Sequence, residues 1–207
     1  MKTPYENAYK LACEKLAGLD LEDVAFNSSA RLEDGAIYLD LMGETFAIKE
    51  HGSEITVDSG GAHREPSINE KIILLHYLIT ADGSALKGEE ITLQEIPGAS
   101  FYYPTYKART IDLIISKFSH SYDKLIEVAQ SIGFKAIKAP GSCRLKSLIL
   151  PNVPVSFILW LPADAGGTID ADSLKILYDA GINHYLPLED IIILTELIAH
   201  KIVKASE

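Results

Sequence analysis

The chain has 207 residues, with 19 Lys and Arg against 29 Asp and Glu, a net charge of −10, and 47% hydrophobic residues. This apolar content excludes a disordered chain. The excess of carboxylates disfavours nucleic acid as a partner, because affinity for a polyanion comes mostly from Lys and Arg. No apolar run reaches the roughly 20 residues that cross a bilayer, and the polar N-terminus lacks a signal-peptide core. We therefore expect a cytoplasmic protein without a membrane or nucleic-acid partner.

The first third of the sequence predicts a helix followed by a β-meander. Residues 5–17 repeat apolar side chains at helical spacing and are followed by a glycine, which is typical of a helix end. Short β-type runs separated by tight turns come next, at 36–42, 45–49 and 54–58. This spacing favours an antiparallel meander.

Residues 59–66 have the Gly-, Ser- and Pro-containing composition of a loop, and they are the best candidate for a boundary between two regions of the chain. We expect residues 1–65 to form an N-terminal helix and meander that packs on residues 66–207, with one compact domain overall. Ser67 and Glu70 have the spacing of a capping box, in which each side chain bonds a backbone donor of the other. They predict the start of a mostly apolar helix.

The remaining two thirds mix strands and helices. Residues 91–96 alternate as a strand does, and the run 153–161 is apolar almost throughout. We expect this second strand to be central and covered on both faces. A short helix is predicted at 171–179 and a last helix from Pro187. Further helices are expected at 107–118 and 122–132, and a further strand at 145–150. Without strict alternation of strand and helix, the order predicts an α+β fold, a largely antiparallel sheet covered by helices.

Motifs for catalysis, phosphate binding or metal ligation are missing from the sequence. It has no nucleophile elbow, no glycine-rich phosphate loop and no histidine pair at ligand spacing. Cys13 and Cys143 are too few for a zinc ribbon or an iron–sulfur cluster. Arg144 follows Cys143, and a nearby cation would lower the pKa of the thiol; the alternative is an inert cysteine where a strand begins. We expect no metal and no cofactor, and we assign no catalytic residue.

Aromatic and charged residues form two groups that are candidates for a ligand site. Aromatic rings stack on planar ligands, and a guanidinium such as that of Arg109 pairs with a carboxylate. The alternative is that the tyrosines lie half-buried over a sheet edge and that Glu189 and Asp190 only stabilise a helix start. For His76, which lies on an apolar helix face, the alternative is a core histidine that makes one hydrogen bond, which is the more usual role of such a residue. The predicted cleft comprises His76, Tyr77, Tyr103, Tyr106, Arg109, Trp160, Tyr185 and Glu189.

Several stretches carry a resemblance to a known family. They are Leu74-Leu75-His76-Tyr77-Leu78 with Asp82-Gly83, Thr92 to Pro97-Gly98, Pro151-Asn152-Val153-Pro154 with the apolar run to Trp160, and Leu177-Tyr178-Asp179-Ala180 with Tyr185-Leu186-Pro187-Leu188-Glu189-Asp190. Through them, residues 66–204 resemble domain-of-unknown-function family 3786, an uncharacterised family of anaerobic bacteria and archaea. Some members carry a cysteine-rich iron–sulfur module that two cysteines cannot supply. The resemblance implies no established activity, and it suggests by analogy a role near corrinoid or redox-cofactor metabolism.

These observations lead to three hypotheses. The first is a non-catalytic module that binds a small planar or anionic ligand or a protein partner. The second is an enzyme that uses Glu189, Asp190 or His184 as acid and base groups on a small acidic metabolite. The third is a structural assembly partner, which would present a large apolar surface patch.

Overall fold

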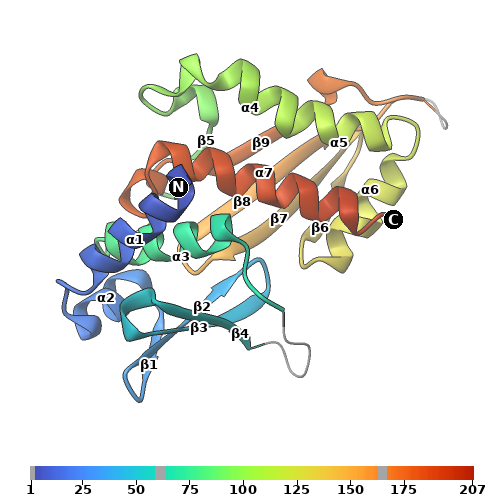
Figure 1. Cartoon of the computed structure of the whole chain (residues 1–207). Coiled ribbons are helices and arrows are strands. Elements are labelled where there is room, and N and C mark those ends of the chain that lie inside the picture. The colour runs from blue at the N-terminus through green and yellow to red at the C-terminus, as the bar shows by residue number, and fades with distance from the viewer. Residues whose placement is uncertain (1–2, 59–63, 163–166) are drawn as a thin grey trace. The chain divides into compact units, whose positions relative to one another are not determined.

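The computed structural model describes residues 3–58, 64–162 and 167–207. Its backbone contacts divide the chain into two compact units. Unit 1 comprises Met1–Leu86, Ile149–Val153 and Gly181–Asp190, and unit 2 comprises Lys87–Leu148, Pro154–Ala180 and Ile191–Glu207. Each unit contains one antiparallel sheet and several helices (Figure 1), so the predicted α+β class is confirmed.

Unit 1 consists of a four-stranded meander and three helices. The strands follow the order β1-β2-β3-β4, and each neighbouring pair is antiparallel. Their bounds are Arg31–Glu33 (β1), Ala36–Leu41 (β2), Glu44–Lys49 (β3) and Glu54–Asp58 (β4), and the helices are α1 (Pro4–Leu16), α2 (Leu21–Ser28) and α3 (Ile68–Thr80). The meander is therefore confirmed, with β1 as an additional first strand.

The core of unit 1 follows from residue spacing. Alternate residues of β2, including Ile37 and Leu39, are buried opposite Ile48 and Phe46 of β3, because side chains of a strand point alternately to two faces. The predicted capping box at the start of α3 is present, with hydrogen bonds in both directions between Ser67 and the Glu70 residue three positions on.

Two later segments of the chain complete unit 1. The amide of Met42 donates to the carbonyl of Ile149 at 2.8 Å. The buried hydroxyl of Tyr77 donates to the carbonyl of Ser28 at 2.8 Å and accepts from the amide of Asn152 at 3.2 Å. The first third of the chain therefore receives part of its hydrogen bonding from residues 149–153.

Unit 2 consists of a five-stranded sheet and the helices that pack on it. The strand order is β5-β9-β8-β7-β6. The strands are β5 (Glu90–Thr92), β6 (Lys135–Ala139), β7 (Ser142–Leu150), β8 (Val153–Trp160) and β9 (Leu174–Asp179), and the helices are α4 (Tyr103–Arg109), α5 (Ile111–Phe118), α6 (Tyr122–Ser131) and α7 (Leu188–Lys204). The last two residues of β7, the first of β8 and the first three of α7 are assigned to unit 1. In Figure 1, α5 and α7 lie across one face of this sheet.

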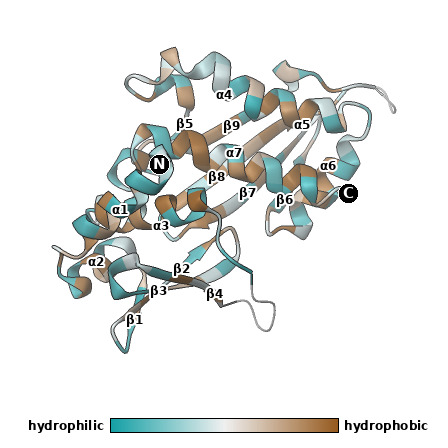
Figure 2. Cartoon of the chain, viewed as in Figure 1, coloured by the Kyte–Doolittle hydropathy of each residue, from teal (hydrophilic) through white to brown (hydrophobic). Residues whose placement is uncertain are grey.

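Hydrophobic residues concentrate between that sheet face and the helices. Figure 2 shows them along β8 and β9 and on α5 and α7. On β8, Val155, Phe157 and Leu159 are fully buried, whereas Trp160 is 40% exposed. The strand is central, as we expected, but the prediction that both of its faces are covered is wrong. Its second face carries Pro154, Ser156 and Ile158 as well, and belongs to the partly open side of the sheet.

Two local predictions in unit 2 are wrong. Residues 171–179 form a 3-10 turn, Ala171–Ser173, followed by strand β9 instead of a helix. The buried residues Leu174, Ile176 and Tyr178 recur at every second position, which is the period of a strand. The strand predicted at 91–96 ends at Thr92 and continues as a 3-10 turn.

Among the described residues, no helix is both long and apolar enough to cross a membrane.

Candidate functional site

Charge is distributed unequally between the two units. Unit 1 contains seven Lys and Arg against 17 Asp and Glu, whereas unit 2 contains twelve of each. The net charge of −10 is therefore carried by unit 1, and unit 2 is neutral as a whole. The net negative charge of the chain therefore does not apply to unit 2, where local cations decide whether an anion binds.

Cations gather on the partly open side of the unit 2 sheet, which we call the outer sheet face. Strand register places Ile158 beside Lys175, Ile137 beside Arg144, and Lys135 beside Lys146. Glu90 lies beside Asp179 on the same face. Its charged residues are thus four cations and two carboxylates: Lys135, Arg144, Lys146, Lys175, Glu90 and Asp179.

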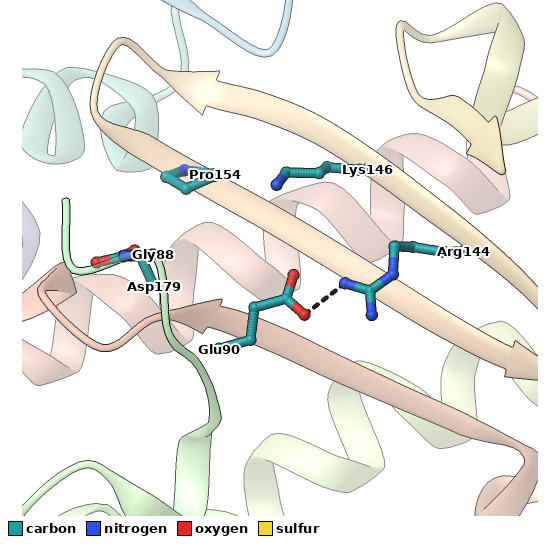
Figure 3. Close-up of a pocket in the computed structure, with 6 residues that line it drawn as sticks. All are labelled: Gly88, Glu90, Arg144, Lys146, Pro154 and Asp179. Carbon is teal, nitrogen blue, oxygen red and sulfur yellow. Dashed lines mark hydrogen bonds and ion pairs between the residues drawn. The ribbon is translucent and has the colours of Figure 1, made fainter.

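A recess of about 270 Å³ opens on this face. We call it the Lys146 recess, and Figure 3 shows the residues that line it, which come from β5, β7, β8, β9 and the segment before β5. They are Gly88, Glu90, Arg144, Lys146, Pro154 and Asp179. Two cations and two carboxylates therefore face the same small volume.

Both carboxylates of the Lys146 recess are held by hydrogen bonds. Asp179, which is buried, accepts from the amides of Lys87 at 3.0 Å and Gly88 at 2.7 Å. Glu90 accepts from the hydroxyl of Ser156 at 2.8 Å and forms an ion pair with Arg144. Burial raises the pKa of Glu90, but the hydrogen bonds from Arg144 and Ser156 outweigh it, so the pKa lies below its ordinary value. Both carboxylates are consequently committed to groups of the protein itself.

Lys146 differs from the other charged groups of the recess. Among the residues that the structure describes, its ammonium makes neither a hydrogen bond nor an ion pair, and the side chain is exposed. Figure 3 shows the amine on the side of the recess where Pro154 lies. An ammonium has three donors and prefers anionic acceptors, so Lys146 is the group that remains available to an incoming anion.

Four of the predicted site residues lie in unit 1. Nδ1 of His76 is 2.6 Å from Oδ2 of Asp190, whose side chain is only 5% exposed. The rings of Tyr77 and Tyr185 stack at 6.0 Å, and both residues are buried, so their ring faces are occupied by the protein. Glu189 is exposed. The structure therefore brings His76 close to Asp190 and Tyr77 close to Tyr185.

The other four predicted site residues lie in unit 2. Tyr103 and Tyr106 are neighbours with ring centroids 6.0 Å apart, and Tyr106 is buried. Arg109 is exposed and pairs with Glu196 at 3.4 Å. Trp160 lies on the outer sheet face, with the amine of Lys175 at 5.4 Å from its ring centroid. The predicted eight residues are thus split equally between the units, and binding at them stays a prediction.

The proposed acid and base groups have separate partners. Nδ1 of His184 lies 2.8 Å from Asp82 and 3.3 Å from the hydroxyl of Ser84. A Ser–His–Asp relay requires the serine and the carboxylate on opposite ring nitrogens, so this cluster lacks that geometry. Hydrogen bonds from Ser84, and then from His184, lower the pKa of Asp82 to about 2. Asp190 contacts His76 instead.

The suggestion that Arg144 activates Cys143 is wrong. Cys143 is fully buried, and burial raises the pKa of its thiol above the ordinary value. Adjacent residues of a strand point to opposite faces, which places Cys143 on the helix-covered side and Arg144 on the outer sheet face. Within the described parts of the chain, no three His, Cys, Asp or Glu side chains are grouped so that they can hold a metal ion.

None of the residues that line the Lys146 recess belongs to the predicted cleft. The available signal was the spacing of Arg144 and Lys146, two cations on either side of buried Leu145, which places both on one face of a strand. The participation of Glu90 and Asp179 depends on the pairing of β5 with β9, whose residues are 89 positions apart at that point. No local pattern in the sequence contains that information.

Two antiparallel sheets with their helices define a mixed α+β protein with a charged recess on one sheet. The chain belongs to the family described as domain of unknown function DUF3786, whose model matches residues 20–201. This confirms the family resemblance, and the match also includes residues 20–65, which we placed before the family-like region. Comparisons with curated proteins and with solved structures gave no match.

Proposed function

We propose that the protein is a non-catalytic binding module that holds a small molecule by an anionic group in the Lys146 recess. The observation that carries the proposal is the state of the four charged groups there. Asp179 and Glu90 are satisfied by protein donors, whereas the Lys146 ammonium is not. An anion at this position gains a charge-assisted hydrogen bond without displacing a hydrogen-bonded partner of Lys146, whose charge otherwise acts on the Glu90 carboxylate through space.

Arg144 supplies a second cationic donor beside Lys146. Its guanidinium has five N–H donors in a planar fork, and the ion pair with Glu90 uses Nη1. The remaining donors can share an anion with Lys146, since both side chains line the recess. Lys146 and Arg144 come from one strand two positions apart, so the rigid sheet fixes their spacing.

The size of the recess limits the ligand class. About 270 Å³ is slightly smaller than the usual range for sites of drug-sized ligands, about 300–1,000 Å³. The recess therefore suits a carboxylate or phosphate group together with a small body. The chemistry shared by these ligands is a compact group with one or two negative charges.

Replacing Lys146 with Gln tests the proposal. We expect inorganic phosphate or citrate to bind the full chain, and Lys146→Gln to weaken that binding about tenfold, which corresponds to the loss of one charged hydrogen bond. Isothermal titration calorimetry at low ionic strength measures the affinity, which should fall as salt is added. Lys117→Gln on α5 removes the same charge at an exposed position outside the recess.

The control decides between a site and a general charge effect. Lys117→Gln should leave the affinity unchanged. Equal weakening by both substitutions, or unchanged binding in Lys146→Gln, would contradict the Lys146 recess as the site. Absence of binding of both anions to the unaltered chain would do the same.

A further inference from the structure

The outer sheet face exposes apolar side chains in addition to its cations. Ile137 is 56% exposed, Leu148 57% and Trp160 40%. They lie on three neighbouring strands, β6, β7 and β8. On the opposite face of the same sheet, the central residues Leu145, Phe157 and Ile176 are buried. An exposed apolar surface of this kind on a folded sheet is typical of an interaction site.

Cations lie next to these exposed apolar residues. Arg144 is the register partner of Ile137, and Lys175 lies over the ring of Trp160. Lys135 and Lys146 continue the row toward Leu148 along β6 and β7. Arg144 already pairs with Glu90, but a partner that covers the apolar side chains must bring negative charge to Lys135, Lys146 and Lys175, since burying a cation without an anionic partner is costly.

From this arrangement we infer that the outer sheet face docks an acidic segment of a partner protein, with apolar side chains among its carboxylates. On β8 the face extends from Pro154 to Trp160, which is about 20 Å at about 3.4 Å per residue. That length matches a short strand or a few turns of helix. The face includes Arg144 and Lys146 of the recess, but the inference goes beyond the recess because it also requires Trp160, Lys175 and Ile137, which do not line it.

A protein segment fits this face better than single-stranded nucleic acid does. Base stacking uses several aromatic side chains along a basic groove. The exposed apolar residues here are one Trp and the aliphatic Ile137 and Leu148. Nucleic acid is accordingly an alternative that the experiment distinguishes.

The test uses the full chain and three fluorescent probes. One is a peptide of about 12 residues that alternates Glu with Leu, which is long enough to span the face. The second replaces each Glu by Lys, and the third is an oligothymidylate of the same number of units. Fluorescence anisotropy should show that the Glu–Leu peptide binds and that the other two probes bind at least about tenfold more weakly.

Two substitutions locate the peptide on the face. Trp160→Ser and Lys175→Glu should each weaken the Glu–Leu peptide about tenfold, whereas the charge reversal Lys117→Glu should not. All three side chains are exposed, and unchanged circular dichroism spectra and melting temperatures would show that the variants remain folded. Unchanged affinity in both face variants, preference for the Lys–Leu peptide or the oligothymidylate, or no binding of the Glu–Leu peptide would overturn the inference.

The outcome separates this inference from the proposed function. Lys175→Glu should leave phosphate binding in the Lys146 recess intact, because Lys175 does not line the recess. Loss of phosphate binding together with retained peptide binding would contradict the recess alone. Retained phosphate binding without peptide binding would contradict the docking surface alone.

Discussion

Tyr178→Phe is expected to destabilise the protein by about 2 kcal/mol, and Tyr106→Phe by only about 1 kcal/mol. Both tyrosines are buried in unit 2, and their hydroxyl oxygens are 2.7 Å apart. The hydroxyl of Tyr178 is also 2.7 Å from Oγ1 of Thr195, which donates to the carbonyl of Ile191 at 2.8 Å. The two phenols are chemically alike, but their positions in this chain of hydrogen bonds are different.

The direction of every hydrogen bond in this series follows from the last one, in which the Ile191 carbonyl can only accept. Because Thr195 gives its proton to a carbonyl, it accepts from Tyr178, and Tyr178 in turn accepts from Tyr106. Tyr178→Phe removes the acceptor of Tyr106 and leaves a buried donor unpaired, which costs about 1–3 kcal/mol. Tyr106→Phe removes only the first donor, and the remaining ones keep their acceptors.

The double variant provides the decisive comparison. Tyr106→Phe in the Tyr178→Phe background removes the unpaired donor, so the double variant should be no less stable than Tyr178→Phe alone. Urea denaturation measures each free energy of unfolding, and the interaction energy follows from the double-mutant cycle. Additive effects, or a larger cost for Tyr106→Phe, would contradict the direction of the chain.

We expect Arg64→Ala to destabilise the protein by about 2 kcal/mol at neutral pH, through a charged network in unit 1. The Arg64 guanidinium donates to both oxygens of Glu44, at 3.0 and 2.8 Å, and to both oxygens of Glu70, at 3.0 and 2.6 Å. The Glu70 side chain is only 10% exposed. Without the Arg64 guanidinium, Glu70 would remain a largely buried carboxylate with fewer hydrogen-bond donors.

The control for Arg64 is Lys10→Ala. Lys10 pairs with Glu14 at 3.2 Å on α1, and both side chains are more than half exposed. Exposed pairs of this spacing contribute about 0.5 kcal/mol or less. In urea denaturation at neutral pH, the free energies of unfolding of the two variants should therefore differ by more than about 1 kcal/mol. A similar cost for both would show that the Arg64 network acts as an exposed ion pair.

The effect of Arg64→Ala should depend on pH. Burial raises the pKa of Glu70, but the hydrogen bonds from Arg64 and Ser67 outweigh it and lower the pKa below the ordinary value of 4.5. A carboxylate with a lowered pKa in the folded state stabilises the protein above its unfolded pKa, and that contribution is lost as the pH falls through the folded value. The difference in unfolding free energy between the unaltered chain and Arg64→Ala should therefore shrink below about pH 4.5. A constant difference down to the acid transition would contradict this role of Glu70.

Local patterns predicted those parts of the fold that local interactions determine. The capping box of Ser67 and Glu70 and the alternation in β2 and β3 each involve residues that are close in sequence. The prediction of a helix at 171–179 is wrong because a glycine after a short apolar run is compatible with the end of a helix and with the end of a strand. The two-residue period of Leu174, Ile176 and Tyr178 favours the strand. Helix α2 was missed because eight residues provide only two turns of pattern.

The candidate site was less predictable than the fold for a physical reason. Aromatic residues near one another in sequence suggested a cleft, yet Tyr77, Tyr106 and Tyr185 are buried and serve the packing of their units. The four charged residues of the Lys146 recess are instead brought together by strand pairing from positions 90, 144, 146 and 179. Which of several charged residues retains a free donor depends on the others' partners, and those partners are known only once the chain is folded.

The composition of unit 1 has a consequence for how the protein is made. Besides residues 1–86, this unit contains 149–153 and 181–190. A ribosome synthesises a chain in the direction from N- to C-terminus, so Tyr77 cannot meet Asn152, nor His76 meet Asp190, until those later residues have been synthesised. The nascent first third must wait with these groups unpaired, and during synthesis it is exposed to chaperones and proteases. Residues 1–86 therefore reach their final structure only after the two later segments of unit 1 have been synthesised.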